Sequence, residues 1–109
     1  MTRGELVKVA LPGDPGKPRP SVVVQADLFN ETHASVTVSP VTSSLVSAPL
    51  FRLAVEPSPR NGLRALSQVM VDKLTTVRRE RIGATIGELE PEPLTRVNRA
   101  LALWLGIAG

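Results

Sequence analysis

The 109-residue sequence has no cysteine, one histidine and only three aromatic residues. Without cysteine, neither a disulfide nor a thiolate metal site can form, which fits a reducing compartment such as the cytoplasm. Because His33 is the only histidine, two histidines of one chain cannot act as acid and base. The scarcity of aromatic residues argues against nucleic-acid binding driven by base stacking, and it leaves Val, Leu, Ile and Ala to build the core.

Long apolar segments are also missing. No apolar run reaches the ~20 residues that span a bilayer, and residues 1–5 lack the apolar stretch of a signal peptide. We therefore expect no membrane partner and a cytoplasmic location. The length suits a single domain, residues 1–109, with one modest core.

Charge of neither sign dominates the sequence. The net charge of +3 and the pI of about 10.2 fit an anionic partner. A solvated surface with a slight cationic excess explains the same values, so charge alone does not choose between the two interpretations.

The first half of the sequence predicts strands separated by polar loops. Alternation at residues 5–11 places Val7, Val9 and Leu11 on one face of a first strand. Three prolines and two glycines make residues 12–18 an irregular loop. Residues 21–25 are typical of a strand that is buried on both faces. The next segments are a turn-rich connection at 27–33, a strand at 34–38, a hydroxyl-rich loop at 42–49 and a strand at 50–55.

The second half begins with a turn at residues 57–62, where Asn61-Gly62 is the strong local signal. Residues 66–71 and 74–77 favour two short strands or one bent strand, with a helix over 63–71 as the alternative. A helix is predicted from Pro91 to a stop at Gly106. Its apolar stripe has helical spacing and consists of Leu94, Val97, Leu101, Trp104 and Leu105.

Five or so short strands followed by one helix predict a mainly β fold. The expected architecture is a small, strongly bent antiparallel sheet or barrel closed by the helix. The stripe of the helix is large for such a small barrel, and part of it would stay uncovered in a monomer. We therefore expect a homodimer.

Two side chains at junctions between strand and loop have chemistry that suits a phosphate. Arg19 lies two residues before the strand at 21–25, and Thr42 follows the strand at 34–38. A guanidinium and a hydroxyl at the ends of neighbouring strands can hold a phosphate without a metal. Taken singly, an arginine before proline is more often merely solvated, and a threonine in a loop more often stabilises a turn.

Four blocks in order resemble the MazF/PemK/Kid-type toxins of bacterial toxin–antitoxin pairs, from about Gly4 to Ile107. The blocks are Gly4-Glu5-Leu6-Val7, Arg19-Pro20 with Val22-Val23-Val24-Gln25, Pro40-Val41-Thr42-Ser43, and Ser67 through Asp72–Val77 with Arg81-Ile82-Gly83. The closing helix and Leu105-Gly106-Ile107 match in type.

The resemblance implies a small SH3-like antiparallel β-barrel with a C-terminal helix, a fold shared with the gyrase poison CcdB. It also implies a homodimer, a cognate antitoxin, and metal-independent cleavage of single-stranded RNA at short sequences, with no cofactor. On this resemblance, Arg19 and Thr42 fall on the catalytic arginine and threonine. The 2′-hydroxyl would attack the adjacent phosphate and leave a 2′,3′-cyclic phosphate and a 5′-hydroxyl.

Five further residues are expected to contact RNA: Lys17, Ser43, Ser67, Lys73 and Arg78. The lysines and arginine would attract phosphates, although each could equally be a solvated surface residue. The sequence departs from the family in the loop before Arg19, which is shorter and has Asp14 as its only acid. The target sequence and the general base are therefore left open.

Two alternatives remain at this point. A CcdB-like protein would poison DNA gyrase and cut nothing, but Trp104-Leu105-Gly106-Ile107 matches the gyrase-contacting Trp-Gly-Ile run of that class only in part. The third interpretation is an inactive barrel that only binds an antitoxin or RNA. Arg19 and Thr42 favour the nuclease.

Overall fold

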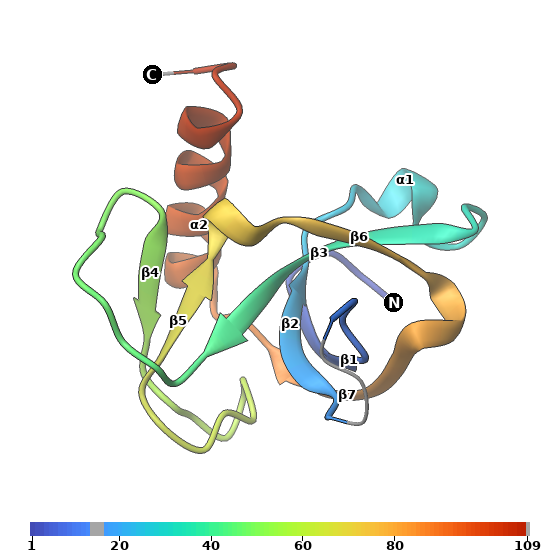
Figure 1. Cartoon of the computed structure of the whole chain (residues 1–109), viewed down its shortest axis with the longest axis horizontal. Helices are drawn as coiled ribbons and strands as arrows, with labels where there is room; N and C mark the ends of the chain where they lie inside the picture. Colours follow the sequence, from blue (N-terminus) through green and yellow to red (C-terminus); the bar gives the residue numbers. More distant parts are fainter. Residues whose placement is uncertain (14–16, 109) are drawn as a thin grey trace.

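The computed structural model describes residues 1–13 and 17–108 (Figure 1). Asp14, the acid noted in the loop before Arg19, lies outside these residues. The described chain contains strands, two α-helices and two 3₁₀ turns, in this order: β1 (Glu5–Val9), β2 (Arg19–Val23), α1 (Asp27–Asn30), β3 (Ser35–Thr42), β4 (Arg52–Val55), β5 (Ser67–Met70), η1 (Val71–Lys73), β6 (Thr75–Arg78), η2 (Arg79–Arg81), β7 (Ile82–Glu88) and α2 (Pro91–Trp104).

The seven strands of the described chain form one antiparallel sheet in the order β4-β5-β3-β2-β1-β7, and β6 also pairs with β3. The sheet is strongly curved, so that β6 and β7, which η2 joins, come round toward each other, while α2 packs on the far side of β4 and β5 (Figure 1). The predicted mainly β fold with a C-terminal helix is confirmed.

Strand β3 changes partners along one of its edges. Its first half pairs with β6 through Ser35–Val38, and its end pairs with β5 through Val41 and Thr42. Pro40 lies between these two ladders, where a missing N–H costs no hydrogen bond on this edge. The turn η1 joins β5 to β6 opposite this point, and the Ser39 hydroxyl donates to the Met70 carbonyl across it at 2.8 Å. Of the two arrangements left open for residues 66–71 and 74–77, two short strands is correct, with β5 at Ser67–Met70 and β6 at Thr75–Arg78.

The core has two parts, one on each face of the central strands. One part joins β1, β2, β3, β4 and β5 to α2 and contains Leu6, Val22, Val41, Val69 and Val97. The other lies inside the curl of the sheet and contains Val7, Val9, Val23, Val38 and Val77. Leu6 and Val7 of β1, and Val22 and Val23 of β2, thus point into different parts, which explains the continuous apolar run of β2.

Helix α2 begins and ends as the sequence predicts. Pro91 occupies its first turn. Gly106 has φ +72°, and the N–H groups of Gly106 and Ile107 donate to the carbonyls of Leu103 and Ala102, which closes the helix in a Schellman motif. Among the described residues, no helix combines the length and the apolar character needed to cross a membrane.

The expected stripe of α2 is buried only in its middle. Val97 and Leu101 are in the core, whereas Trp104 and Leu105 are 50% and 56% exposed. Trp104 still contacts Phe51, with 5.6 Å between the ring centroids.

Three expectations about local structure were wrong, and the alternative of a helix over 63–71 is excluded. Residues 27–33 contain the short helix α1 rather than turns alone. Thr42 is the last residue of β3 rather than part of a loop, because the strand continues through Pro40. The count of five or so strands missed β7, whose sequence has two glycines and mostly exposed side chains.

The long connection between β4 and β5, residues 56–66, is tied to the start of α2. The Ser58 hydroxyl and the Asn61 amide donate to the Glu90 carboxylate at 2.6 and 3.3 Å. Asn61 is fully buried and also bonds the Glu56 carbonyl and the N–H groups of Ser58 and Leu63. The hydrogen bond from Ser58, followed by backbone hydrogen bonding, lowers the pKa of Glu90 below its ordinary value.

Stability should therefore depend on Glu90 at acid pH. A folded-state pKa below the unfolded value of about 4.3 contributes stability above that value, and the contribution is lost as the pH falls through the folded pKa. We expect Glu90→Gln to show a smaller loss of unfolding free energy than the parent protein between about pH 5 and pH 3. Urea unfolding at a series of pH values measures this. Glu31→Gln, at an exposed position after α1, is the control, and parallel pH curves for the parent and Glu90→Gln would contradict the assignment.

Candidate functional site

A cleft of about 340 Å³ opens where β2 and β3 separate. The β2–β3 ladder ends at the pair Ser21–Pro40. Beyond it β3 continues along β5, whereas β2 stays with β1, so the two strand ends diverge (Figure 1). Residues of these two strand ends, of β1, β5 and β7, and of the loop before β5 line the cleft. They are Lys8, Arg19, Pro20, Val41, Thr42, Ser43, Gly62, Leu63, Arg64, Ala65, Ser67 and Ile86.

Arg19 and Thr42 each lie two residues beyond the last β2–β3 pair, on opposite sides of the divergence. Arg19 is the first residue of β2, pairs with Val9 of β1 and is exposed. Its φ and direction are constrained by the ladder on one side and by Pro20 on the other. The cleft therefore brings together the guanidinium and the hydroxyl that the sequence predicted as a pair.

The hydroxyl of Thr42 is oriented by its own loop. Its Oγ1 accepts a hydrogen bond from the Ser44 N–H at 3.0 Å. Since the oxygen is used as an acceptor there, its proton remains available for donation into the cleft. Thr42 is also fixed by its pairing with Gln68 of β5, whose side chain bonds the backbone of Val46 at 2.7 and 3.1 Å.

Ser43 and Ser67 also line the cleft, as expected for RNA-contacting residues. Ser43 is exposed beside Thr42. Ser67 is 5% exposed, and its hydroxyl donates to the Ala65 carbonyl at 2.9 Å, so that it shapes the end of the loop.

The wall opposite Arg19 depends on backbone packed directly on backbone. A Cβ at Gly62, which has φ +71°, would lie 2.0 Å from the Ile86 carbonyl oxygen. A Cβ at Gly87 would lie 2.4 Å from the Arg60 oxygen and 2.5 Å from the Asn61 oxygen. Only glycine at both positions lets the loop lie on β7 and hold residues 62–65 over the cleft.

Sequence reasoning missed two cations of the cleft, Lys8 and Arg64. Lys8 interrupts the apolar residues of the first strand, and its pairing with Pro20 places its Cα one residue along the ladder from that of Arg19. Arg64 follows the Asn61-Gly62 turn. The alternation of the first strand could have suggested Lys8, but nothing local signals which way the loop carrying Arg64 folds.

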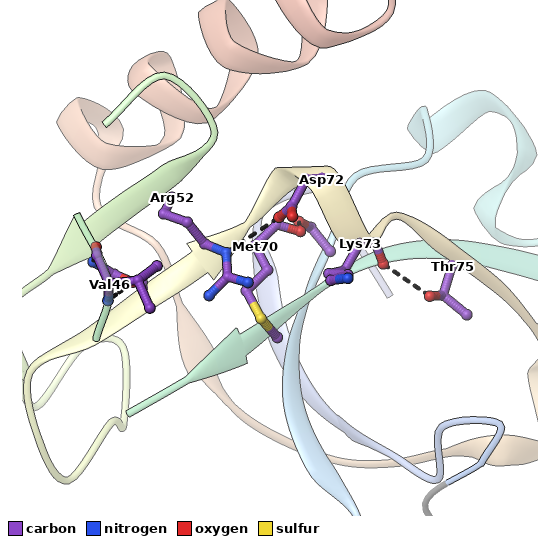
Figure 2. Close-up of polar contacts among 8 residues, drawn as sticks. Val46, Arg52, Met70, Asp72, Lys73 and Thr75 are labelled. Atoms are coloured by element: carbon purple, nitrogen blue, oxygen red, sulfur yellow. Dashed lines mark hydrogen bonds and ion pairs between the residues drawn. The ribbon is translucent and has the colours of Figure 1, made fainter. Parts of the chain in front are cut away.

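Lys17, Lys73 and Arg78 do not line the cleft, although all three are exposed. Lys73 belongs to η1, where the Thr75 hydroxyl donates to its carbonyl and Arg52 pairs with Asp72 at 3.2 Å (Figure 2). Arg78 ends β6, opposite Ser35. His33 is exposed and outside the cleft, and its carbonyl accepts a hydrogen bond from Arg79.

None of the described residues that line the cleft carries a carboxylate or an imidazole. In the part of the chain that the structure describes, no group of three or more histidines, cysteines and acids could hold a metal. What the cleft offers is three cations and three hydroxyls, a set suited to binding phosphate oxygens and to stabilising charge on them.

Comparisons with known proteins agree with this description. Residues 2–105 match the family model described as PemK-like, MazF-like toxin of type II toxin–antitoxin system. The chain is 46% identical over its whole length to the probable endoribonuclease MazF of Mycolicibacterium smegmatis, which it also covers completely. It is 25% identical to endoribonuclease EndoA of Bacillus subtilis, over 84% of this chain and 79% of that protein.

Solved structures share the fold. A mycobacterial endoribonuclease in complex with its cognate antitoxin superposes with a TM-score of 0.84 at 25% identity, covering 100% of this chain and 98% of that one. The Mycobacterium tuberculosis toxin MazF-mt6 has a TM-score of 0.80 over 94% and 96% of the two chains; at 22% identity, this likeness concerns the fold alone.

The glycine contact under the cleft wall can be tested directly. Gly87→Ala should lower the free energy of unfolding by about 1–3 kcal/mol, because its Cβ collides with backbone that cannot move aside without displacing the loop. Urea unfolding measures the loss. Ala84→Ser adds one atom at an exposed position of the same strand and should have an effect below about 0.5 kcal/mol. Equal stability of the two variants would show that the loop does not rest on β7.

Proposed function

Because the chain belongs to the PemK-like, MazF-like toxin family of type II toxin–antitoxin systems, we propose that it is an endoribonuclease toxin that cuts single-stranded RNA in the cleft holding Arg19 and Thr42. The endoribonuclease class follows from the family and from two relatives named endoribonucleases, of which this chain covers 100% and 79%. The alternative of a CcdB-like gyrase poison is not favoured, since the relatives are endoribonucleases. The convergence of Arg19 and Thr42 on one cleft is the observation that supports the assigned site.

The reaction proposed is attack of an RNA 2′-hydroxyl on the adjacent phosphate. The O2′–P bond forms, the P–O5′ bond breaks, the 2′-hydroxyl loses its proton and the leaving 5′-oxygen gains one. Negative charge builds on the non-bridging oxygens as five bonds surround phosphorus. Groups already aimed at that charge lower the barrier without having to reorganise.

Arg19 is proposed to bind those oxygens. Its guanidinium presents a planar fork that donates two parallel hydrogen bonds and stays charged at every relevant pH. Thr42 is proposed to donate its remaining hydroxyl proton to a non-bridging oxygen or to align the 2′-hydroxyl. Both roles are orientation and charge stabilisation, and neither residue accepts a proton readily near pH 7.

The other predicted contacts divide by location. Ser43 and Ser67 are proposed to touch the RNA inside the cleft, which both of them line. Lys17, Lys73 and Arg78 are proposed to act outside it, as exposed charges that attract the phosphate backbone.

We further propose a homodimer in the cytoplasm, inhibited by a cognate antitoxin. One solved relative is an endoribonuclease in complex with its antitoxin. For the dimer, the support is an apolar surface at the end of α2, where Trp104, Leu105 and Ile107 are 50–77% exposed. A hollow beside it, lined by Val24, Leu74, Leu101 and Leu105 among others, offers room for a partner side chain.

Cleavage by the purified protein tests the site. Arg19→Ala and Thr42→Val should each lower the rate at least ~100-fold in the presence of a chelator, because each removes a donor aimed at developing charge. The substrate is cellular mRNA, and the products are mapped at their 5′-hydroxyl ends, which also reveals the target sequence. Arg99→Ala removes an exposed cation of α2 away from the cleft and should cut normally.

Undiminished cutting by both variants would refute the assigned site. If the parent protein cut no RNA and instead trapped gyrase on DNA, the endoribonuclease proposal itself would fail.

The dimer has a separate test. Sedimentation equilibrium should give about twice the chain mass of 11.6 kDa, and Leu105→Glu should give the monomer mass, because a charge cannot be buried in an apolar interface. Leu28→Glu, at an exposed site on α1, is the control and should remain dimeric. A parent protein that is monomeric at micromolar concentration would contradict this interface.

A further inference from the structure

The cleft has two cations for which the proposed reaction gives no role. Lys8, Arg19 and Arg64 come from three segments far apart in the sequence and line the same cleft. Only Arg19 is needed at the phosphate that reacts. We propose that Lys8 and Arg64 are binding sites for the RNA phosphates on either side of the scissile one. This inference rests on the proposed function and adds the route of the RNA strand through the cleft.

The position of Lys8 follows from the strand register. Val9 pairs with Arg19 and Lys8 pairs with Pro20, so Lys8 is one step along the ladder from Arg19. With about 4.8 Å between strands and about 3.3 Å per residue, the two Cα atoms are about 6 Å apart. Successive side chains of a strand point to opposite faces, so Lys8 shares its face with Pro20 whereas Arg19 starts on the other face. Both still line the cleft, so the two long side chains approach it from either side of the strand edge and can bind different phosphates of one RNA strand.

The flank of Lys8 is kept open by glycine. The backbone of β7 passes so close that a Cβ at Gly83 would lie 3.2 Å from the Lys8 carbonyl oxygen and 3.7 Å from its Cβ. With glycine there, no side chain of that residue covers the stem of Lys8, which is exposed.

Arg64 belongs to the wall across the cleft. The loop that carries it is held by the buried Asn61 and by the glycine contact with β7. Arg64 itself is exposed at the cleft. A cation on a firmly held loop is pre-positioned, so binding it to a phosphate requires little ordering.

The charges near this loop favour an anion in the cleft. Two carboxylates that contact the loop are already engaged: Glu88 pairs with Arg60 at 3.3 Å, and Glu90 accepts from Ser58 and Asn61. No described residue that lines the cleft is acidic. A polyanion passing through would therefore meet cations on both walls.

The expected kinetic effect differs from that of Arg19. Flanking phosphates keep the same charge in the substrate and in the transition state, so cations that bind them stabilise both states equally. Removing such a cation raises KM and leaves kcat unchanged. Phosphates also carry no sequence information, so the cleavage site should not move.

Lys8→Met and Arg64→Met test the proposal, because methionine keeps an apolar stem and removes the charge. The probe is a short single-stranded RNA that contains the mapped target, with a 2′-deoxynucleotide at the cleavage position so that it binds without being cut. Each variant should bind about twofold to tenfold more weakly at low salt. The slope of log K against log salt should become shallower by about 0.7 for each phosphate that the protein no longer neutralises. On cleavable RNA, KM should rise while kcat and the cut position stay the same.

Arg99→Ala, which changes net charge by the same amount, is the matched control and should leave the salt slope unchanged. Unaltered slopes and KM values in both methionine variants, with Arg19→Ala still inactive, would overturn this inference and leave the proposed function standing. The same result accompanied by weakened antitoxin binding would overturn it too, and would assign the two cations to acidic groups of the antitoxin. A parent protein that neither binds nor cuts the RNA would overturn the proposed function instead.

Discussion

Strand β3 pairs with two different strands along one of its edges, and the rest of the molecule is arranged around this double pairing. β6 uses the first half of the edge and β5 uses its end. Between them the chain must bend, and it does so with η1 on one side and Pro40 on the other. A proline in a central strand would normally remove a ladder bond. Pro40 pairs with Ser21 of β2 on one edge, and on the other it lies between the β5 and β6 ladders, where its missing N–H costs no hydrogen bond. The Ser39 hydroxyl bridges the same point to Met70.

The bend also makes the site. Because β3 leaves β2 in order to follow β5, the last residues of β3 and the first residue of β2 move apart and the cleft lies between them. Thr42 is then fixed by pairing with Gln68, and Arg19 by pairing with Val9. Each chemical group is held by a different neighbour, so their separation is set by the sheet and not by the loops. That is a rigid way to position a guanidinium and a hydroxyl around one phosphate.

The sequence predicted what depends on local pattern and on residue type. The alternation in β1, the apolar run of β2 and the buried middle of the α2 stripe were correct, and Arg19 and Thr42 line one cleft. What the sequence could not predict depends on which segments of the chain pair with or pack on one another. The strand predicted at 34–38 ended before Pro40, and β3 continues through this proline only because its missing N–H faces an unpaired stretch of the strand edge. β7 was overlooked because its two glycines weaken any strand pattern, although Gly87 is needed where residues 60–61 pack on β7 and Gly83 where β7 passes Lys8 of β1. The direction of Arg64 follows from the contact at Gly87, so the residues next to Arg64 in the sequence do not indicate it.

The packing of residues 60–62 on Ile86 and Gly87 has a consequence for synthesis. One wall of the cleft rests on β7, which comes near the end of the chain and pairs with β1, near its start. A nascent chain shorter than about residue 87 has Arg19 and Thr42 but no support for the loop that faces them. The cleft is therefore completed only after β7 has been made and has paired with β1, well after the residues of β2 and β3 have left the ribosome.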